Sequence, residues 1–274
     1  LNPTSMVSVP NFIFLCAPEL LSQGLASGAK GVAGFGPTQF AFPTQLATAF
    51  NFTGKFSICL SPSTDSSGVI FFGDGPYVLL PGIDVSKLLI FTPLIIKPRN
   101  GYYIRVKSIR VNGKQVPLKK GNIGGTKIST VNPYTVLEAS IYSSVTNIFI
   151  QEAMVSNVTR VASVAPFGVC FSTKNNNGAL STRPALPFID LMLQDEVVFW
   201  RIFETNSMVP VGNDVACLGF LDGGLNLRTS IIIGGYQLED NFLQFDLVSS
   251  RLGFTSSLLL RQTSCAYYNF TSIV

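Results

Sequence analysis

The 274-residue sequence contains no histidine, and this absence removes several kinds of catalysis. A Ser-His-Asp triad, a Cys-His pair, a histidine general base and a histidine-ligated zinc site are all excluded. The five cysteines stand at least 43 residues apart, so no CxxC metal or redox motif occurs. We therefore expect neither a metal nor a cofactor.

Charge and long hydrophobic runs are also scarce. Charged residues make up 12% of the chain, the net charge is +4, and no run of lysine or arginine exceeds two residues. A nucleic-acid partner is not expected, because such proteins carry clustered basic residues. The longest uncharged stretch, residues 31–54, is interrupted by prolines and polar side chains, so no membrane span is expected either.

Short apolar segments separated by turns indicate a mainly β, or all-β, fold. Hydrophobic residues reach 47%, and 24 glycines and 16 prolines divide them into short runs. Residues 56–60 and 69–72 are expected to form a strand pair. The Asn112-Gly113 pair between alternating segments predicts a hairpin.

Two helices are expected. A short one has Pro43 in its first turn. The main helix is expected from about Pro133 to Ala153, with Asn132 as its cap. Its apolar stripe at helical spacing consists of Leu137, Ile141, Val145 and Ile148.

The spacing of the cysteines indicates structural disulfides in an exported protein, with one cysteine left over. Three N-x-S/T sequons, at Asn51, Asn157 and Asn269, agree with export and predict N-linked glycosylation. The chain begins at Leu1, without Met and inside a β-like run, which we interpret as a fragment or a processed chain.

Several glycine-centred blocks, in this order, resemble the C-terminal two-thirds of a pepsin-like aspartic proteinase of the plant type. They are Gly31-Val-Ala-Gly-Phe-Gly followed by Pro-Thr-Gln-Leu, Phe72-Gly-Asp-Gly-Pro, Phe91-Thr-Pro-Leu, and Ile231-Ile-Ile-Gly-Gly with Phe245-Asp-Leu and Arg251-Leu-Gly-Phe. More narrowly, the chain resembles the plant extracellular dermal glycoprotein group, which includes basic globulins of legume seeds and inhibitors of xylanases and xyloglucan-specific endoglucanases. The most specific stretch is Gly124-Gly-Thr-Lys-Ile-Ser-Thr-Val-Asn-Pro-Tyr.

The resemblance implies the pepsin-like bilobal fold. Residues 1–87 would form the second half of an incomplete N-terminal lobe, and residues 88–274 a complete C-terminal lobe. It also implies disulfides Cys170–Cys217 and Cys59–Cys265, with Cys16 paired to a cysteine upstream of Leu1. A monomer secreted to the plant cell wall or apoplast is expected.

Aspartic proteinases hold two carboxylates, one from each lobe, that share a proton. The second should lie in an apolar-Asp-Ser/Thr-Gly-Thr motif, but this sequence has Ile128 followed by Ser129, Thr130 and Val131. Ser129 stands at the carboxylate position and Val131 at the glycine position. Because a serine hydroxyl does not ionise in this pH range, we expect a pseudo-proteinase and not an enzyme.

A scaffold without catalysis suggests a binding function. In the inhibitor group, loops of the C-terminal lobe block the cleft of a microbial endoglucanase or xylanase, whose two catalytic carboxylates suit an arginine fork. The candidate arginines are Arg228 and Arg183, each at the end of a polar loop. Alternatives are an active aspartic endopeptidase and a storage or wall-binding glycoprotein that does not inhibit.

Overall fold

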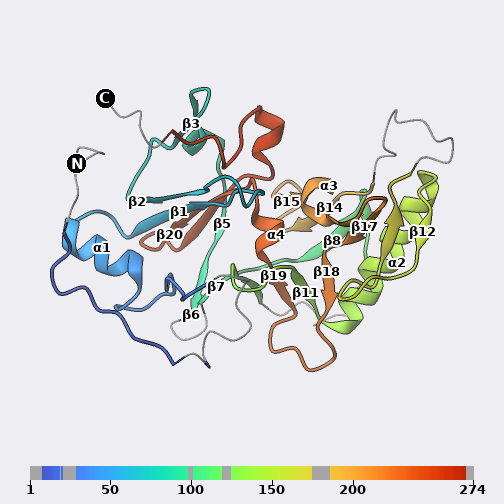
Figure 1. Ribbon diagram of the computed structural model, residues 1–274, viewed down its shortest axis with the longest axis horizontal. Coiled ribbons are helices and arrows are strands. Elements are labelled where there is room, and N and C mark those ends of the chain that lie inside the picture. The colour runs from blue at the N-terminus through green and yellow to red at the C-terminus, as the bar shows by residue number, and fades with distance from the viewer. Residues whose placement is uncertain are drawn as a thin grey trace.

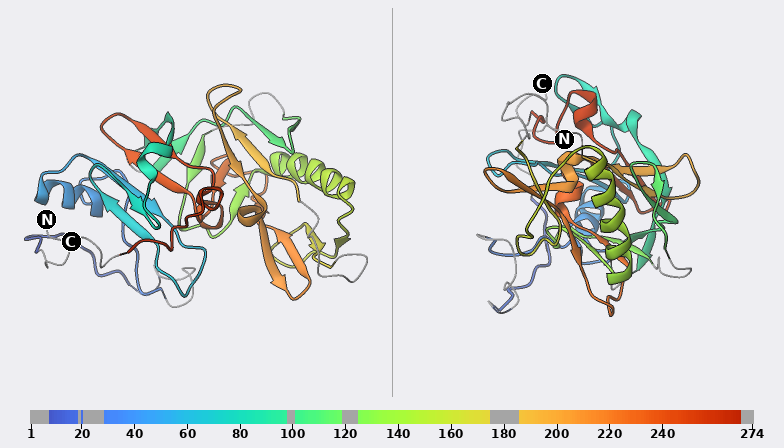
Figure 2. Two further views of the ribbon diagram at one scale, coloured as in Figure 1. Left: turned by 90° about the horizontal axis from the view of Figure 1, so that it is seen from above. Right: turned by 90° about the vertical axis from the view of Figure 1, so that its right-hand side faces the viewer.

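The computed structural model describes residues 8–18, 20, 29–97, 101–118, 125–174 and 186–269 (Figure 1). The molecule is elongated, with helix α1 (Phe42–Phe50) at one end and helix α2 (Ala139–Val155) at the other, as two further views show (Figure 2). Strands fill the space between these helices. The mainly β fold expected from the sequence is confirmed.

A five-stranded antiparallel sheet joins segments that are far apart in the sequence. Its order is β2 (Val69–Phe72), β1 (Lys55–Cys59), β20 (Phe242–Asp246), β21 (Arg251–Phe254) and β5 (Ile90–Pro93). The expected pair β1–β2 is confirmed, with Phe56 opposite Phe72. On its other side Phe56 pairs with Phe245, and their rings stack with centroids 4.7 Å apart. Strands β20 and β21, late in the chain, therefore complete the core around β1 and β2. The lobe boundary expected at residue 87 stays a prediction.

A six-stranded mixed sheet lies nearer α2. Its order is β18 (Phe220–Asp222), β11 (Thr135–Leu137), β19 (Ile231–Ile233), β10 (Thr126–Ile128), β7 (Gly101–Ile104) and β6 (Ile95–Lys97). Strands β10 and β19 are parallel, as are β11 and β18. One face of the sheet carries the buried side chains of Ile128, Leu137, Ile231 and Ile233, and the opposite face is partly open.

The remaining strands form two four-stranded sheets and one small pair. One sheet is β15 (Phe199–Ile202), β14 (Ile189–Met192), β8 (Ser108–Val111) and β9 (Lys114–Gln115); the other is β12 (Arg160–Val161), β13 (Cys170–Ser172), β17 (Val215–Leu218) and β16 (Met208–Gly212). Strands β3 (Val78–Leu79) and β4 (Ile83–Asp84) pair alone. The β8–β9 hairpin turns at Asn112 and Gly113, whose φ angles of 51° and 83° suit the expected turn.

The main helix begins later than predicted. It starts at Ala139, and Glu138 caps it by accepting hydrogen bonds from the backbone N–H groups of Ser140 (3.0 Å) and Ile141 (3.4 Å). Thr135–Leu137, expected in the first turns, forms strand β11 between β18 and β19. The helical signal at Asn132 and Pro133 was therefore wrong, because pairing with distant strands overrides local propensity.

Helix α1 is confirmed, with Pro43 in its first turn. The shorter helical segments are α3 (Glu204–Ser207), α4 (Gly235–Leu238) and the 3-10 helices η2 (Val85–Leu88) and η3 (Leu258–Arg261). Among the described residues, no helix has both the length and the apolar character needed to cross a bilayer.

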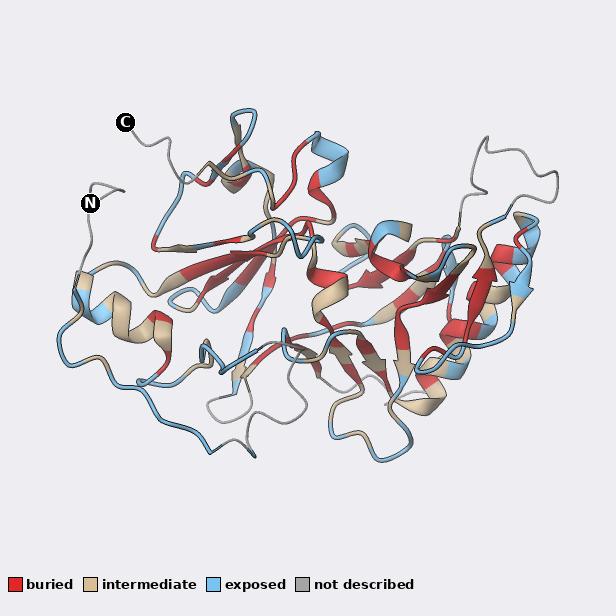
Figure 3. Cartoon of the chain, viewed as in Figure 1, coloured by how far each residue is buried: buried red, intermediate tan, exposed pale blue. Residues whose placement is uncertain are grey.

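Burial is uneven along the molecule (Figure 3). The main core fills the sheets and the inner side of α2, where Ile141, Val145 and Phe149 are fully buried. Near the N-terminus, in contrast, Phe14 is 76% and Leu15 91% exposed.

Candidate functional site

The loop between β10 and β11 holds the residues at the expected carboxylate position. The backbone N–H of Ser129 donates to the carbonyl of Ile233 in β19 (3.0 Å). The hydroxyl of Ser129 donates to Oδ1 of Asn132 (2.8 Å) and accepts from the Asn132 backbone N–H (3.3 Å). Ser129 is 9% exposed, whereas Thr130 and Val131 are exposed. The serine therefore stabilises the turn of its own loop.

A second segment crosses this loop immediately after β19. The N–H groups of Gly235 and Tyr236 donate to the carbonyls of Asn132 (2.8 Å) and Pro133 (2.9 Å). At Gly234 a Cβ atom would lie 2.2 Å from the carbonyl carbon of Tyr134, so the close contact requires glycine. The Gly234-Gly235 pair thus holds the Ser129 loop against the sheet.

A buried amide fixes the start of β11. Oε1 of Gln237 accepts hydrogen bonds from both the backbone N–H and the hydroxyl of Thr135, each at 2.8 Å. Its Nε2 donates to the carbonyls of Asn206 (2.9 Å) and Gly219 (3.0 Å). All donors and acceptors of this side chain have partners, so Gln237 gives the loop a rigid base.

A cleft of about 820 Å³ separates the Ser129 loop from the loop and strand at residues 59–70. Among the described residues that line it, Glu239 is the sole carboxylate. Burial raises the pKa of Glu239 to about 7, and the neighbouring Asp240 carboxylate adds to the shift. Aspartic proteolysis needs two carboxyl groups that share a proton, and the described lining of this cleft supplies one of them.

The loop after β18 presents Arg228. Oδ1 of Asp222 accepts from the Gly224 N–H (2.8 Å), which turns the chain at a glycine with φ of 74°. The side chains of Leu227 and Val136 both lie beside Gly223, where a Cβ would be 3.0 Å from Leu227 Cδ2 and 2.7 Å from Val136 Cγ1, and the Gly223 N–H donates to the carbonyl of Leu137 (2.8 Å). The loop is therefore anchored on the sheet on both sides of its tip.

Arg228 is exposed at the end of this anchored loop. Within the part of the chain that the structure describes, it forms no ion pair with Asp222 or with any other carboxylate. Arg183, the other candidate, lies outside the described residues.

Two family models match most of the chain. The model described as "Xylanase inhibitor C-terminal" matches residues 101–256, and "Xylanase inhibitor N-terminal" matches residues 1–74. The chain belongs to the xylanase-inhibitor family. This family has the pepsin-like aspartic proteinase fold expected from the sequence.

Proteins similar to this chain include proteins named as aspartic proteinases and as globulins. "Probable aspartic proteinase GIP2" of Nicotiana benthamiana is 53% identical, and the alignment covers 99% of this chain and 66% of that protein. "Gamma conglutin 1" of Prunus dulcis is 44% identical, covering 98% and 62%, and "Basic 7S globulin" of Glycine max is 40% identical, covering 97% and 64%. This chain thus spans somewhat under two thirds of the length of these relatives.

Two solved structures have the same fold. The structure titled "Crystal structure of edgp" superposes with a TM-score of 0.88 at 53% identity, covering 96% of this chain and 68% of that one. The soybean basic 7S globulin gives 0.82 at 39% identity, covering 96% and 67%.

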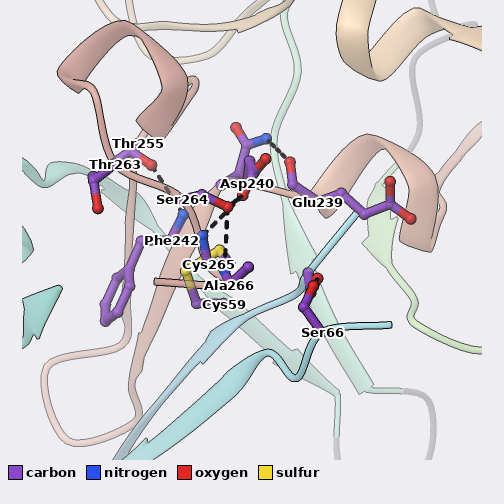
Figure 4. The surroundings of a disulfide bond; sticks show 12 residues. Cys59, Ser66, Glu239, Asp240, Phe242, Thr255, Thr263, Ser264, Cys265 and Ala266 are labelled. Carbon is purple, nitrogen blue, oxygen red and sulfur yellow. Dashed lines mark hydrogen bonds between the residues drawn. A yellow bond between two sulfur atoms is a disulfide. The ribbon is translucent and has the colours of Figure 1, made fainter. Parts of the chain in front are cut away.

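Both disulfides implied by the resemblance are present. Cys170–Cys217 joins β13 to β17, and Cys59–Cys265 ties the C-terminal segment to β1. Figure 4 shows the second bond, beside which Oδ1 of Asp240 accepts hydrogen bonds from the Ser264 hydroxyl and the Cys265 N–H, both at 2.8 Å. Cys16 is unpaired and exposed.

The sequons differ in accessibility. Asn51 and Asn157 are exposed and follow the C-terminal ends of α1 and α2, in the left-handed conformation that asparagine tolerates. Asn269 is half-buried, and the rest of its sequon lies outside the described residues. Glycosylation at all three sites stays a prediction.

Sequence reasoning did not find Gln237 or Glu239. The partners of Gln237 are backbone groups and a threonine far away in the sequence, and the pKa of Glu239 depends on burial. Neither residue belongs to a recognisable sequence motif.

Proposed function

We propose that this protein is a catalytically inactive aspartic-proteinase homologue that inhibits microbial cell-wall glycoside hydrolases, either xyloglucan-specific endoglucanases or xylanases. It acts as a secreted monomer in the plant cell wall or apoplast. Membership of the xylanase-inhibitor family supports this function. The two disulfides agree with an extracellular protein.

The observation that carries the proposal is the contrast between Ser129 and Arg228. The side chain at the carboxylate position is a hydroxyl engaged within its own loop. Arg228, in contrast, is exposed on an anchored loop that connects two strands of the same sheet. A preorganised tip loses little conformational entropy on docking, so most of its interaction energy is retained.

The inhibitory step is charge pairing in the target's cleft. Glycoside hydrolases place a pair of carboxyl groups at the scissile bond, one on each side of it. The planar guanidinium of Arg228 matches a carboxylate through two parallel hydrogen bonds. A bound arginine tip would exclude the polysaccharide from the cleft without any bond being cleaved.

Titration of a fungal xyloglucanase and a xylanase with the protein tests the proposal. One of these enzymes should lose activity with saturating, substrate-competitive inhibition, and the Arg261→Ala variant, which alters an exposed arginine on η3, should inhibit as well as wild type. Absence of inhibition at large protein excess would leave the storage or wall-binding function. Pepstatin-sensitive cleavage of a protein substrate would instead establish an endopeptidase.

A further inference from the structure

Positive and negative charges are segregated along the chain. Ten of the 19 lysines and arginines fall between residues 85 and 137, a stretch without any aspartate or glutamate. The rest of the chain carries nine cations and all 15 carboxylates. A net charge of +4 therefore conceals one strongly basic segment in an otherwise acidic protein.

Part of this basic segment is neutralised by carboxylates from elsewhere. Lys87 pairs with Asp84 (3.6 Å), Lys114 pairs with Glu152 (2.5 Å), and Arg110 pairs with Glu196. Lys97 and Lys127 form no ion pair with any carboxylate of the described residues.

These two lysines lie together on the open face of the six-stranded sheet. Tyr103 in β7 is opposite Lys127 in β10, and opposite Ile95 in β6. Cross-strand partners point to the same side, as do residues two apart in a strand, so Lys97 also lies on this face. Its Nζ is 4.2 Å from the centroid of the Tyr103 ring.

Lys97 and Lys127 thus flank Tyr103, one strand to each side. With neighbouring strands roughly 4.8 Å apart, the two lysine-bearing strands are separated by about 10 Å. A Cβ at Gly125 would lie 3.1 Å from Tyr103 Cδ1 and 3.9 Å from Lys97 Nζ, so glycine leaves room for this packing. We call Lys97, Tyr103 and Lys127 the basic face.

We propose that the basic face binds an anionic polysaccharide whose charges are uronic-acid carboxylates, at a site separate from Arg228. A linear polycarboxylate presents charges in a row, and compact ammonium groups can pair with them without a fixed bidentate geometry. Tyr103 is only 4% exposed, so it offers no ring face on which a nucleic-acid base could stack. Because Lys97 is exposed and Lys127 half-exposed, the binding is sensitive to salt.

The test is binding of the protein to polygalacturonate over a range of sodium chloride concentrations, with fully methyl-esterified polygalacturonate as the neutral comparison. Lys97→Ala/Lys127→Ala is compared with Lys30→Ala/Arg261→Ala, which removes the same charge from exposed positions elsewhere. Lys97→Gln/Lys127→Gln keeps polar side chains of some length over Tyr103, and thermal unfolding checks that each variant folds.

Wild type should bind the charged polymer and not the ester. At low salt, both basic-face variants should bind the polymer about tenfold more weakly than wild type. The slope of log affinity against log salt concentration should fall by an amount that corresponds to roughly one to two released counterions. The affinity of the control variant should stay within about twofold of wild type. Equal weakening of binding in the control variant would show that the effect depends on net charge alone, and it would contradict a specific site at the basic face. Tighter binding of a single-stranded oligonucleotide through the same lysines, or no binding of the polymer, would also overturn it.

Discussion

The hydroxyl of Ser129 donates a 2.8 Å hydrogen bond to Oδ1 of Asn132, three residues further along the same loop. Replacing Ser129 with Ala leaves that oxygen and the Asn132 N–H without this partner in a largely buried loop. We expect the free energy of unfolding to fall by about 1 kcal/mol. Urea denaturation measures this change, and Thr130→Ala, at an exposed neighbouring position, should have almost no effect. Equal losses in both variants would contradict a structural role for the serine hydroxyl.

Placing an acidic side chain at position 129 should not produce proteolysis. Ser129→Asp supplies one carboxylate, but Glu239 is the sole carboxylate in the described lining of the adjoining cleft, and it comes from the end of α4. An aspartic dyad needs two carboxyl groups close enough to share a proton. We expect no pepstatin-sensitive cleavage between pH 3 and pH 7, values chosen to span about the range in which such carboxyls titrate. Cleavage by this variant would show that a second catalytic carboxylate is present.

Glu239 should make stability depend on pH. Burial raises its pKa to about 7, above the ordinary value of 4.5, so the folded state favours the protonated form. Its contribution is most favourable below about pH 4.5 and is lost as the pH rises toward 7, because deprotonation is easier in the unfolded chain. Glu239→Gln should match wild type near pH 4.5 and have a higher melting temperature near pH 7.5. A parallel pH dependence in both proteins would contradict the raised pKa.

The two disulfides should contribute unequally. Cys59–Cys265 closes a loop with a sequence separation of 206, against 47 for Cys170–Cys217. In the chain-entropy model, the longer loop stabilises by about 1 kcal/mol more. Cys59→Ala/Cys265→Ala should therefore lower the denaturation midpoint further than Cys170→Ala/Cys217→Ala. The reverse order would show that local packing around Cys170 outweighs loop length.

Local signals predicted the elements that depend on local contacts. Pro43 marked the first turn of α1, and Asn112-Gly113 marked the β8–β9 turn. The start of α2 was misplaced because Thr135–Leu137 pairs with β18 and β19, more than 80 residues later. No local pattern encodes that pairing.

The candidate site shows the same division. Ser129 could be recognised because its motif is contiguous in the sequence, whereas Gln237 acts on Thr135 across a separation of 102 residues. The basic face could be predicted from the sequence only in part. Its acid-free stretch can be counted in the sequence, but the register that brings Lys97 and Lys127 to either side of Tyr103 required the sheet.

Arg228→Lys should separate charge from geometry. Lysine retains the positive charge but lacks the planar fork, so inhibition should be intermediate between wild type and Arg228→Ala. For Arg228→Ala we expect at least about 30-fold weaker inhibition with unchanged thermal stability, because the side chain is exposed and has no ion pair among the described residues. Inhibition constants for the three proteins provide the comparison, and full inhibition by Arg228→Ala would transfer the role to another residue, with Arg183 the next candidate.

The claim that Arg228 pairs with a catalytic carboxylate is tested most directly by a double-mutant cycle. Binding is measured by calorimetry for wild type and Arg228→Ala, each against the native hydrolase and a variant with one catalytic glutamate changed to glutamine. The proposed pairing predicts a coupling energy of at least about 2 kcal/mol between the two positions. A coupling below about 0.5 kcal/mol for both catalytic carboxylates would contradict it.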